Sequence, residues 1–469
     1  MSLKMYHHHT FMSLKVLTPS LKSDIIVEKT GGEAMNRHAL EKLKTWKNSE
    51  PRKPLIIRGA RQVGKTWLMK EFGKQCFEKT AYINFDNNER ARALFDIDLR
   101  PERLILALSA ETGVDIQAGD TLLIFDEVQE APRALTSLKY FCEEAPEYCI
   151  VAAGSLLGVA MHQGTSFPVG KVDFMDLYPL SYTEFLEALG EERFAELLRT
   201  DDHDMIKAFK TTYIERLRQY YFVGGMPEAV LAFVEKKNYQ KVREVQKNLL
   251  NYYQQDFSKH AQANLIPRLN LTWNAIPQQL AKENKKFIYG QVREGARAKD
   301  FELAIQWLLD CGLIHKVYRV TKPQIPLIAY MELDVFKMYL LDVGLLAAMG
   351  DLSEKVIIDG NKIFTEFKGA LTEQYVLQQL VSELGVTPYY YSTPNSRGEI
   401  DFLLQGDTSI IPLEVKAEEN LKARSLRAFC DKFNPKYALR CSMSDFREQD
   451  WLTNVPLYEI LYLEKYLKA

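Results

Sequence analysis

The segment from 55 to 72 restricts the possible folds more than any other part of the sequence. It reads LIIRGARQVGKTWLMKEF: a short apolar run, a loop bounded by Gly59 and Gly64, and then residues with helical spacing. The loop fits the pattern G-x-x-x-x-G-K-[ST], in which inward-pointing backbone N–H groups surround phosphate oxygens. A chance match in a surface turn is the alternative, and the strand–loop–helix context disfavours it. The segment therefore predicts a phosphate-binding loop after a buried strand.

Each residue type in this loop suits one physical task. The two glycines permit backbone angles and a close approach to the ligand that a side chain would block. Lys65 supplies a charge to the β- and γ-phosphates, Thr66 offers a hydroxyl to Mg²⁺, and the following helix adds its positive amino end. We expect nucleotide contacts from Gly59, Ala60, Arg61, Gln62, Val63, Gly64, Lys65, Thr66 and Trp67.

A second apolar run, TLLIFDE at 121–127, ends in two acids. Asp126 is predicted to hold Mg²⁺ through water, and Glu127 to polarise the attacking water. Solvated acids at a strand end are the alternative, and the phosphate loop upstream argues against it. A third run, CIVAAGS, ends at Ser155. Parallel strands place their carboxyl ends together, so Ser155 is a candidate sensor of the γ-phosphate or a plain strand-end serine.

Strands and helices alternate over the first part of the chain, which predicts an α/β fold with a parallel sheet and crossover helices on both faces. The predicted strands are 55–59, 80–86, 121–127 and 149–155, and the predicted helices are 37–48, 65–75, 100–113 and 135–145.

With 469 residues, the chain is expected to form about two or three domains. We place an ATPase-like domain at 35–195, a helical region at 196–330, an α/β domain at 331–469 and a disordered tail at 1–34. Six cysteines without a C-x-x-C pair indicate a reducing compartment and no zinc site. No apolar run approaches the length of a membrane span, and the net charge of −2 gives no global basic field. A cytoplasmic protein is expected.

The middle region changes to amphipathic helices, predicted over 182–199 and 205–222 and continuing to about 312. A strand is predicted at 312–320 and a helix at 337–349. Residues 287–320 resemble a winged-helix segment, with Asp300 as the expected N-cap of its helix. Arg293, Arg297 and Lys299 are candidates for contact with a nucleic-acid backbone. Equally, winged helices often only join domains, and basic residues on a polar turn are usually solvated.

The C-terminal part carries a second set of charged residues on predicted strands. GEIDFLL and PLEVKA read as adjacent strands joined by QGDTS, after a helix at 369–385. Glu414 and Lys416 share one strand face, Asp401 begins the neighbouring strand, and Glu373 lies on the helix. This arrangement resembles the core of PD-(D/E)XK nucleases, a restriction-endonuclease-like fold. In that reading Asp401 and Glu414 bind Mg²⁺, and Lys416 helps to activate water. A hairpin with exposed charges, or a related fold that has lost cleavage, remains open.

Several segments together carry a wider resemblance that spans 35 to about 465. LIIRGARQVGKT, LLIFDEVQEAP, AAGSLLG, VDFMDLYPLSYTEFL and GGMPEAV look like the prokaryotic AAA-type ATP-binding proteins, which carry a C-terminal domain of uncertain function. In similar proteins an arginine commonly stands where Lys171 stands here. If that position supplies a charge to the transition state, lysine is a poorer bidentate donor. A solvated lysine is the alternative.

Two functions follow from these residues. In the first, Lys65, Thr66, Asp126 and Glu127 carry Mg²⁺-dependent ATP hydrolysis, which drives a nucleic-acid-directed module whose site residues are Asp401, Glu414 and Lys416. In the second, the chain is a nucleotide switch that binds a protein partner, and the nuclease-like domain is inactive. An oligomer is compatible with either function. The phosphate loop does not by itself decide between adenine and guanine nucleotides.

Overall fold

The computed structural model describes residues 35–155, 167–282, 285–358, 365–393, 398–418 and 423–468. The predicted tail at 1–34 and the LLG that follows Ser155 lie outside these ranges. No helix within them is long and apolar enough to cross a membrane.

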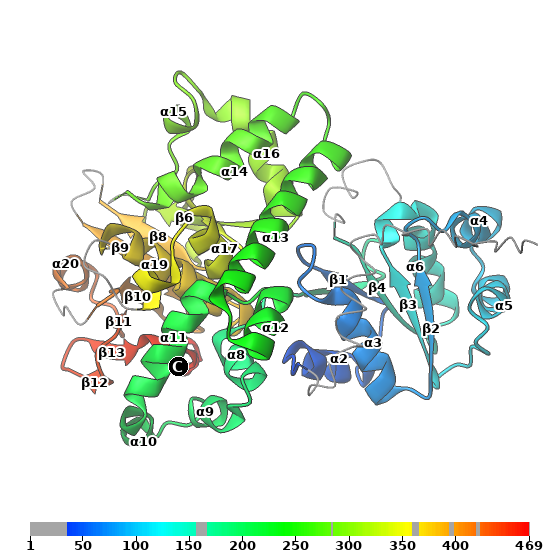
Figure 1. Ribbon diagram of the computed structural model, residues 1–469, viewed down its shortest axis with the longest axis horizontal. Helices are drawn as coiled ribbons and strands as arrows, with labels where there is room; N and C mark the ends of the chain where they lie inside the picture. Colours follow the sequence, from blue (N-terminus) through cyan, green and yellow to red (C-terminus); the bar gives the residue numbers. More distant parts are fainter. Residues whose placement is uncertain are drawn as a thin grey trace, which may run out of the picture. The chain divides into compact units, whose positions relative to one another are not determined.

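The first part of the chain forms a parallel sheet of five strands, in the order β2-β3-β4-β1-β5 (Figure 1). This arrangement confirms the predicted α/β fold. Its elements are α2 (Ala39–Lys47), β1 (Leu55–Arg58), α3 (Lys65–Cys76), β2 (Lys79–Asn84), α4 (Glu89–Ile97), α5 (Pro101–Thr112), β3 (Thr121–Asp126), η1 (Val128–Glu130), α6 (Pro132–Glu144), β4 (Cys149–Ala153) and β5 (Asp173–Asp176).

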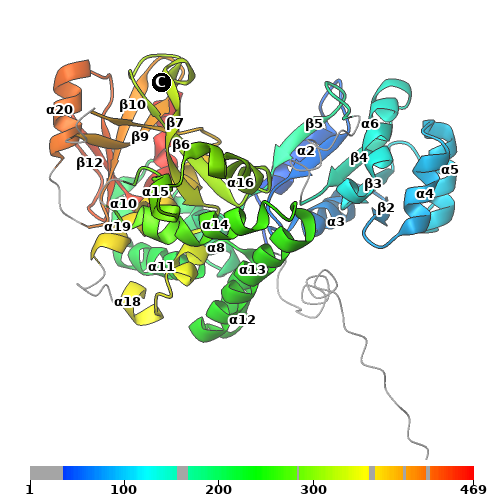
Figure 2. The ribbon, with the colours of Figure 1, turned by 90° about the horizontal axis from the view of Figure 1, so that it is seen from above.

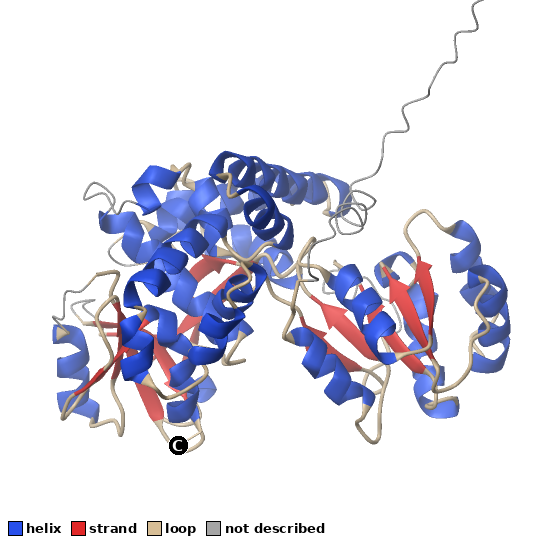
Figure 3. Cartoon of the chain, turned by 60° about the horizontal axis from the view of Figure 1, so that its bottom comes forward, coloured by secondary structure: helices blue, strands red, loops and turns tan. Residues whose placement is uncertain are grey.

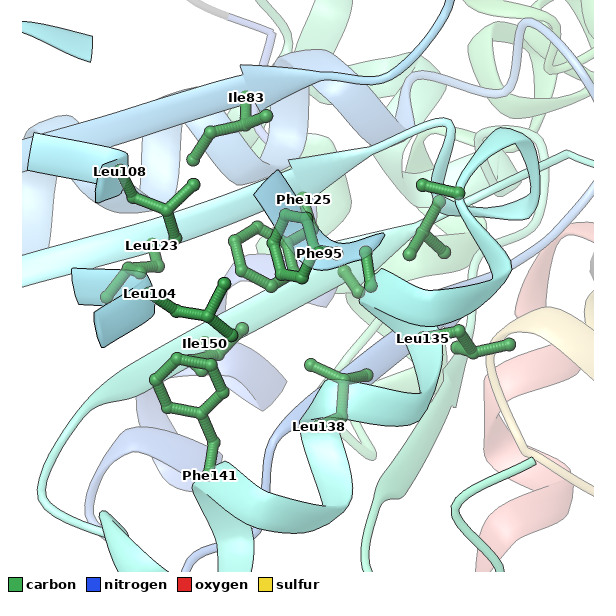
Figure 4. Close-up of a cluster of buried hydrophobic side chains, with 14 of the residues drawn as sticks. Ile83, Phe95, Leu104, Leu108, Leu123, Phe125, Leu135, Leu138, Phe141 and Ile150 are labelled. Atoms are coloured by element: carbon green, nitrogen blue, oxygen red, sulfur yellow. The ribbon is translucent and has the colours of Figure 1, made fainter. Parts of the chain in front are cut away.

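Helices cover both faces of this sheet because its central strands are apolar on both sides (Figure 3). Side chains on one face pack against α4, α5 and α6, whereas α3 packs on the other. Figure 4 shows the first of these clusters, with Phe95 and Phe125 labelled. The rings of these two residues and of Phe85 meet edge to face at centroid distances of 5.5–5.8 Å. This rigid core fixes the carboxyl ends of β1, β3 and β4.

The middle of the chain is helical. Its elements are α8 (Tyr182–Ala188), α9 (Glu192–Leu197), α10 (His203–Ala208), α11 (Lys210–Val223), α12 (Pro227–Lys236), α13 (Tyr239–His260), α14 (Ile266–Leu280), α15 (Tyr289–Val292) and α16 (Ala298–Asp310). The single helix predicted over 182–199 is instead two, because Gly190 adopts a left-handed φ of 75° between α8 and α9.

The remaining strands form one sheet of eight, in the order β12-β13-β11-β10-β9-β8-β6-β7, with α20 beside β9 (Figure 2). The elements are β6 (Ile314–Val320), η2 (Leu327–Tyr330), β7 (Met331–Leu340), α17 (Val343–Met349), α18 (Glu354–Ile358), α19 (Thr365–Ser382), β8 (Tyr389–Ser392), β9 (Glu399–Gln405), β10 (Ile410–Val415), α20 (Arg424–Phe433), β11 (Leu439–Ser442), β12 (Arg447–Glu448), β13 (Thr453–Pro456), η4 (Leu457–Leu463) and α21 (Glu464–Leu467).

Two local predictions in this region were wrong. Residues 337–340 belong to strand β7, which pairs with β6, and the helix begins only at Val343. The buried Asp342 makes the break, because its Oδ1 accepts from Leu345 N at 2.9 Å and caps α17. Asp300 is not the N-cap of α16, because it lies within the first turn and its Oδ2 accepts from Arg297 N at 2.9 Å.

Candidate nucleotide and carboxylate sites

The predicted phosphate loop connects β1 to α3. Gly59, Gln62 and Gly64 have φ values of 148°, 66° and 95°, so the backbone bends in a way that ordinary L-residues avoid. A Cβ at Gly59 would lie 2.2 Å from Leu177 O. Glycine at this position is therefore required by the close passage of the segment that follows β5.

Lys65 is held inside the loop. Its Nζ donates to Gly59 O at 2.9 Å and to Ala60 O at 2.8 Å, and the residue is 7% exposed. Burial lowers the pKa of Lys65 to about 8, against the opposing fields of Glu127 and Asp126. The ammonium group thus rests on carbonyl oxygens that triphosphate oxygens can replace.

Thr66 and Asp126 meet although they lie on different elements. Thr66 Oγ1 donates to Asp126 Oδ2 at 2.7 Å, and Tyr82 OH donates to the same oxygen at 2.9 Å. Burial and the charge of Glu127 raise the pKa of Asp126, and these hydrogen bonds oppose the shift. A hydroxyl beside a carboxylate is a ligand set that suits Mg²⁺, whose remaining positions are usually filled by water and phosphate.

Glu127 and Ser155 also come together at this edge of the sheet. Glu127 has a left-handed φ of 51°, and its Oε2 accepts from Gln129 Nε2 at 2.6 Å. Ser155 Oγ lies 3.4 Å from the same carboxylate oxygen. The structure thus places Ser155 beside Glu127, and its role as a sensor of the γ-phosphate stays a prediction.

Arg37, a buried arginine that no sequence motif indicated, binds the backbone of the phosphate loop. Arg37 donates through Nη1 to Val63 O at 3.0 Å and through Nη2 to Tyr178 O at 2.7 Å, and its Nε lies 3.1 Å from Glu184 Oε1. These groups lie far apart in the sequence, so no local pattern links them.

Helix α13 supplies a second missed contact. Arg61, in the middle of the phosphate loop, forms an ion pair with Asp256 at 2.5 Å, and Tyr253 OH donates to Arg61 O at 2.9 Å. The chain also passes close to the loop at Gly312, where a Cβ would lie 3.2 Å from Ala60 N. The loop is therefore in direct contact with the helical middle region.

Lys171 does not join this site in its own chain. It precedes β5, and the register that pairs Leu55 with Asp173 places it beside the start of β1, at the opposite edge from the loop. Its Nζ lies 2.8 Å from Glu143 Oε1, in an ion pair at the surface. The contribution to the transition state that the resemblance implied is not made within one chain.

The C-terminal charged residues do gather around β9 and β10, which pair antiparallel as predicted. Asp401 Oδ2 accepts from Val415 N at 2.7 Å, and Lys416 Nζ lies 2.6 Å from Glu414 Oε1. Burial and the charge of Glu373 raise the pKa of Asp401, against the opposing fields of nearby lysines. Glu373 on α19 therefore belongs to the same cluster.

One buried atom, Glu414 Oε2, indicates that a cation could fit this cluster. Glu414 has 6% of its side chain exposed, and its Oε2 has no hydrogen-bond partner among the described residues. An unsatisfied buried carboxylate oxygen favours a bound cation. No three His, Cys, Asp or Glu side chains in the described ranges converge closely enough to form a metal site alone. Any such ion would have to complete its coordination with water or substrate.

Two further lysines near the carboxylates were not predicted. Lys285 Nζ lies 2.5 Å from Glu373 Oε1, and the fully buried Lys337 lies 2.6 Å from Glu399 Oε1. Both come from the part of the chain that precedes α19. Arg293, Arg297 and Lys299 are instead exposed around the start of α16.

The five-stranded parallel sheet and the loop between β1 and α3 form an α/β fold of the P-loop type, and residues 51–186 match the family described as an AAA domain. Residues 214–356 and 368–460 match two families that are each described as a domain of unknown function. No curated protein matches the sequence.

Solved structures resemble the chain only distantly. A Walker-type ATPase of Pyrococcus abyssi is 15% identical, with a TM-score of 0.43 over 68% of this chain and 96% of that one. The Orc1 protein of Aeropyrum pernix, solved in complex with DNA, is 14% identical, with a TM-score of 0.26 over 67% and 91%. Cdc6p from Pyrobaculum aerophilum is 11% identical, with a TM-score of 0.25 over 71% and 98%. At these scores the likenesses carry no argument about function.

Proposed function

We propose that the AAA-type domain binds ATP with Mg²⁺ and hydrolyses it, and that this cycle controls a C-terminal carboxylate site that acts on nucleic acid. The contact between Thr66 Oγ1 and Asp126 Oδ2 carries the first half of the proposal. It joins the phosphate loop to the acid of β3, as Mg²⁺-dependent phosphoryl transfer requires.

Each residue of the first site has one role in this reaction. When ATP binds, Lys65 Nζ exchanges its hydrogen bonds to the carbonyl oxygens of Gly59 and Ala60 for hydrogen bonds to oxygens of the β- and γ-phosphates. Mg²⁺, held by Thr66 and Asp126, would neutralise phosphate charge. Glu127 orients the attacking water and accepts its proton, while the bond from the γ-phosphorus to the ADP oxygen breaks. Ser155 steadies Glu127 through their contact.

The test is ATP turnover and binding by purified full-length protein. Lys65→Ala is expected to lose nucleotide binding, whereas Glu127→Gln keeps it and loses about 10²–10⁴-fold in turnover. Lys74→Ala, on the exposed face of the same helix, is the matched control and should behave as wild type. Normal hydrolysis by Lys65→Ala would contradict the assignment.

The order of elements supports a nuclease-like C-terminal unit. Helix α19 is followed by the antiparallel strands β8, β9 and β10, then by the crossover helix α20 and the parallel strand β11. This is the helix–strand order of the PD-(D/E)XK nuclease core. Asp401 and Glu414 would bind Mg²⁺, and Lys416 would stabilise the charge of the attacked phosphate.

Plasmid cleavage in Mg²⁺ tests this half. Wild type should cut, and Asp401→Asn and Lys416→Met should each lose at least about 100-fold in rate. Asp407→Asn, on the exposed turn between the same strands, is the control. Cleavage that survives Asp401→Asn would remove the site from the reaction.

The middle region is proposed to contact the nucleic acid. Helices α14 to α16 lead into the hairpin of β6 and β7, the order of a winged helix. Arg293, Arg297 and Lys299 are exposed there and offer positive charge to phosphates. Replacing all three with glutamine should weaken DNA binding and flatten its dependence on salt.

A nucleotide switch with an inactive nuclease-like domain is the second candidate. The observation that favours it is that Glu373 and Glu414 each form an ion pair with a lysine. These ion pairs leave fewer carboxylate oxygens available to bind a metal. ATP turnover with and without DNA separates the two functions. Stimulation by DNA supports the first, and indifference to DNA with dependence on a protein partner supports the second.

A further inference from the structure

The C-terminal carboxylate cluster is built from two parts of the chain. Helix α19 and strands β9 and β10 provide the acids, whereas Lys285 and Lys337 come from the segment before α19. The backbone at Lys286 forms a bridge with Lys337, so Lys285 is held beside strand β7. An ammonium group from outside the nuclease-like unit thus reaches its cluster of acids.

Three lysines lie beside acids of this cluster, and they differ in how firmly the fold holds them. Lys337 is fully buried and lies 2.6 Å from Glu399, and Lys416 belongs to the same strand as its partner Glu414. These two pairs are fixed within the sheet. Lys285 lies 2.5 Å from Glu373 Oε1, and the second oxygen of Glu373 accepts from Tyr339 OH at 2.9 Å and lies 3.8 Å from Lys337 Nζ. Without Lys285, Glu373 would face Lys337 Nζ at 3.8 Å.

The acids near Lys285 offer oxygen ligands to a divalent cation. The unpartnered, buried Oε2 of Glu414 and the neighbouring Asp401 are oxygen ligands of the kind that Mg²⁺ and Mn²⁺ select. The Lys285 charge opposes a divalent ion at this distance and engages the carboxylate of Glu373. The segment that carries Lys285 therefore decides how much negative charge the cluster offers.

We propose that Lys285 is a built-in competitor of the divalent cation at the C-terminal carboxylate site. When Lys285 contacts Glu373, the site binds metal weakly. When Lys285 does not contact Glu373, the negative charge of Glu373 attracts a divalent ion held by Asp401, Glu414 and water. This inference rests on the proposed metal-dependent role of that site, and it assigns the middle region a regulatory part in it.

Binding of Mn²⁺ to the nucleotide-free full chain tests the proposal, with free ion measured by electron paramagnetic resonance. Lys285→Met should bind Mn²⁺ about fivefold or more tightly than wild type. Adding Asp401→Asn to that variant should remove the gain. Lys285→Arg keeps the charge and should resemble wild type, which separates charge from packing. Lys282→Met, whose amine contacts Gln279, is the matched control.

The outcomes separate this inference from the proposed function. If wild type and Lys285→Met bind Mn²⁺ equally and Asp401→Asn abolishes binding in both, the metal site stands and the competitor role fails. If neither wild type nor Lys285→Met binds Mn²⁺ at Asp401, the metal site and the competitor role both fail. A gain that persists with Asp401→Asn places the ion elsewhere and also overturns the inference. ATP turnover in the same samples reports on the first site independently.

Discussion

The amine of Lys65 is the most informative single group at the residue scale. In the free protein its pKa lies near 8 because it is buried, and an anionic triphosphate must raise that pKa. Binding of ATP therefore takes up a proton wherever the free lysine is neutral. Nucleotide affinity is a direct readout of this protonation.

We predict that ATP affinity is constant below about pH 7.5 and falls as pH rises through 8 to 9.5, by about tenfold per pH unit at most. The sign follows because ATP favours the protonated lysine. Fluorescent-nucleotide titrations from pH 7 to 9.5 measure the effect. Lys65→Arg remains charged throughout and should give a flat profile, and a flat profile in wild type would contradict the prediction.

His38 is a residue at which stability itself depends on pH. Its Nε2 lies 3.0 Å from Glu187 Oε1 and its Nδ1 lies 3.3 Å from Glu383 Oε1. Burial lowers the pKa of His38, but the two carboxylates outweigh burial and raise it to about 10. The same contacts lower the pKa of Glu383 to about 2 although burial opposes them. The network joins α2, α8 and the end of α19.

The His38 contribution to stability should be complete below about pH 6.5 and disappear as pH rises through 10, because only the protonated ring attracts both carboxylates. We expect His38→Gln to cost about 2–4 kcal/mol at pH 6 and much less at pH 10. Urea unfolding at the two pH values measures it. Arg193→Gln, at an exposed ion pair, serves as control. An equal cost at both pH values would refute the assignment.

At the element scale, the turn before α12 is fixed by contacts that leave no room for side chains. A Cβ at Gly225 would lie 2.0 Å from Leu180 O, and one at Gly224 would lie 2.1 Å from Asp342 Oδ1. Gly225 N also donates to Asp342 Oδ2 at 2.6 Å. The glycines of GGMPEAV thus serve packing, and Pro227 is the first residue of α12.

Gly225→Ala should therefore destabilise the protein by about 3 kcal/mol or more, or prevent folding. Gly369→Ala is the matched control, because a Cβ there meets nothing within 4 Å and the residue lies inside α19. That control should be neutral or stabilise by up to about 1 kcal/mol. Thermal unfolding of both variants decides the matter, and a wild-type melting curve for Gly225→Ala would exclude the steric explanation.

Elements with strong local signals were predictable from sequence, and the failures have local causes. The apolar strand β3 and the amphipathic helix α6 follow from periodicity. Residues 337–349 were misassigned because YLLDVGLLAAM carries enough apolar residues for either state. The pairing of β7 with β6, which is a tertiary contact, and the local cap of α17 by Asp342 decided the outcome.

At the scale of the whole molecule, the pair between Arg61 and Asp256 connects the nucleotide loop to α13. The carboxylate of Asp256 opposes an incoming triphosphate and holds a guanidinium that the phosphates could otherwise attract. If the loop binds nucleotide as proposed, we expect binding to be coupled to the position of α13 through this ion pair.

Asp256→Asn should tighten ATP binding about three- to tenfold, because it removes a negative charge and frees Arg61. Isothermal titration of wild type, Asp256→Asn, Arg61→Gln and the double variant gives the coupling between the two residues. The gain should vanish in the Arg61→Gln background if it operates through the guanidinium. Weaker binding by Asp256→Asn would mean that the pair instead holds the loop in its binding conformation.

The sequence alone determined the phosphate loop, the acids at 126 and 127, and the strand pair that carries Asp401 and Glu414. Each depends on neighbouring residues: glycine backbone freedom, apolar periodicity and the placement of charges at strand ends. Only the tertiary structure decided which groups surround them. Arg61 and Asp256 form an ion pair although they are 195 residues apart in the sequence, and Lys285 and Glu373 do so although they are 88 residues apart. Such ion pairs depend on how helices and sheets pack, and no local pattern encodes that packing.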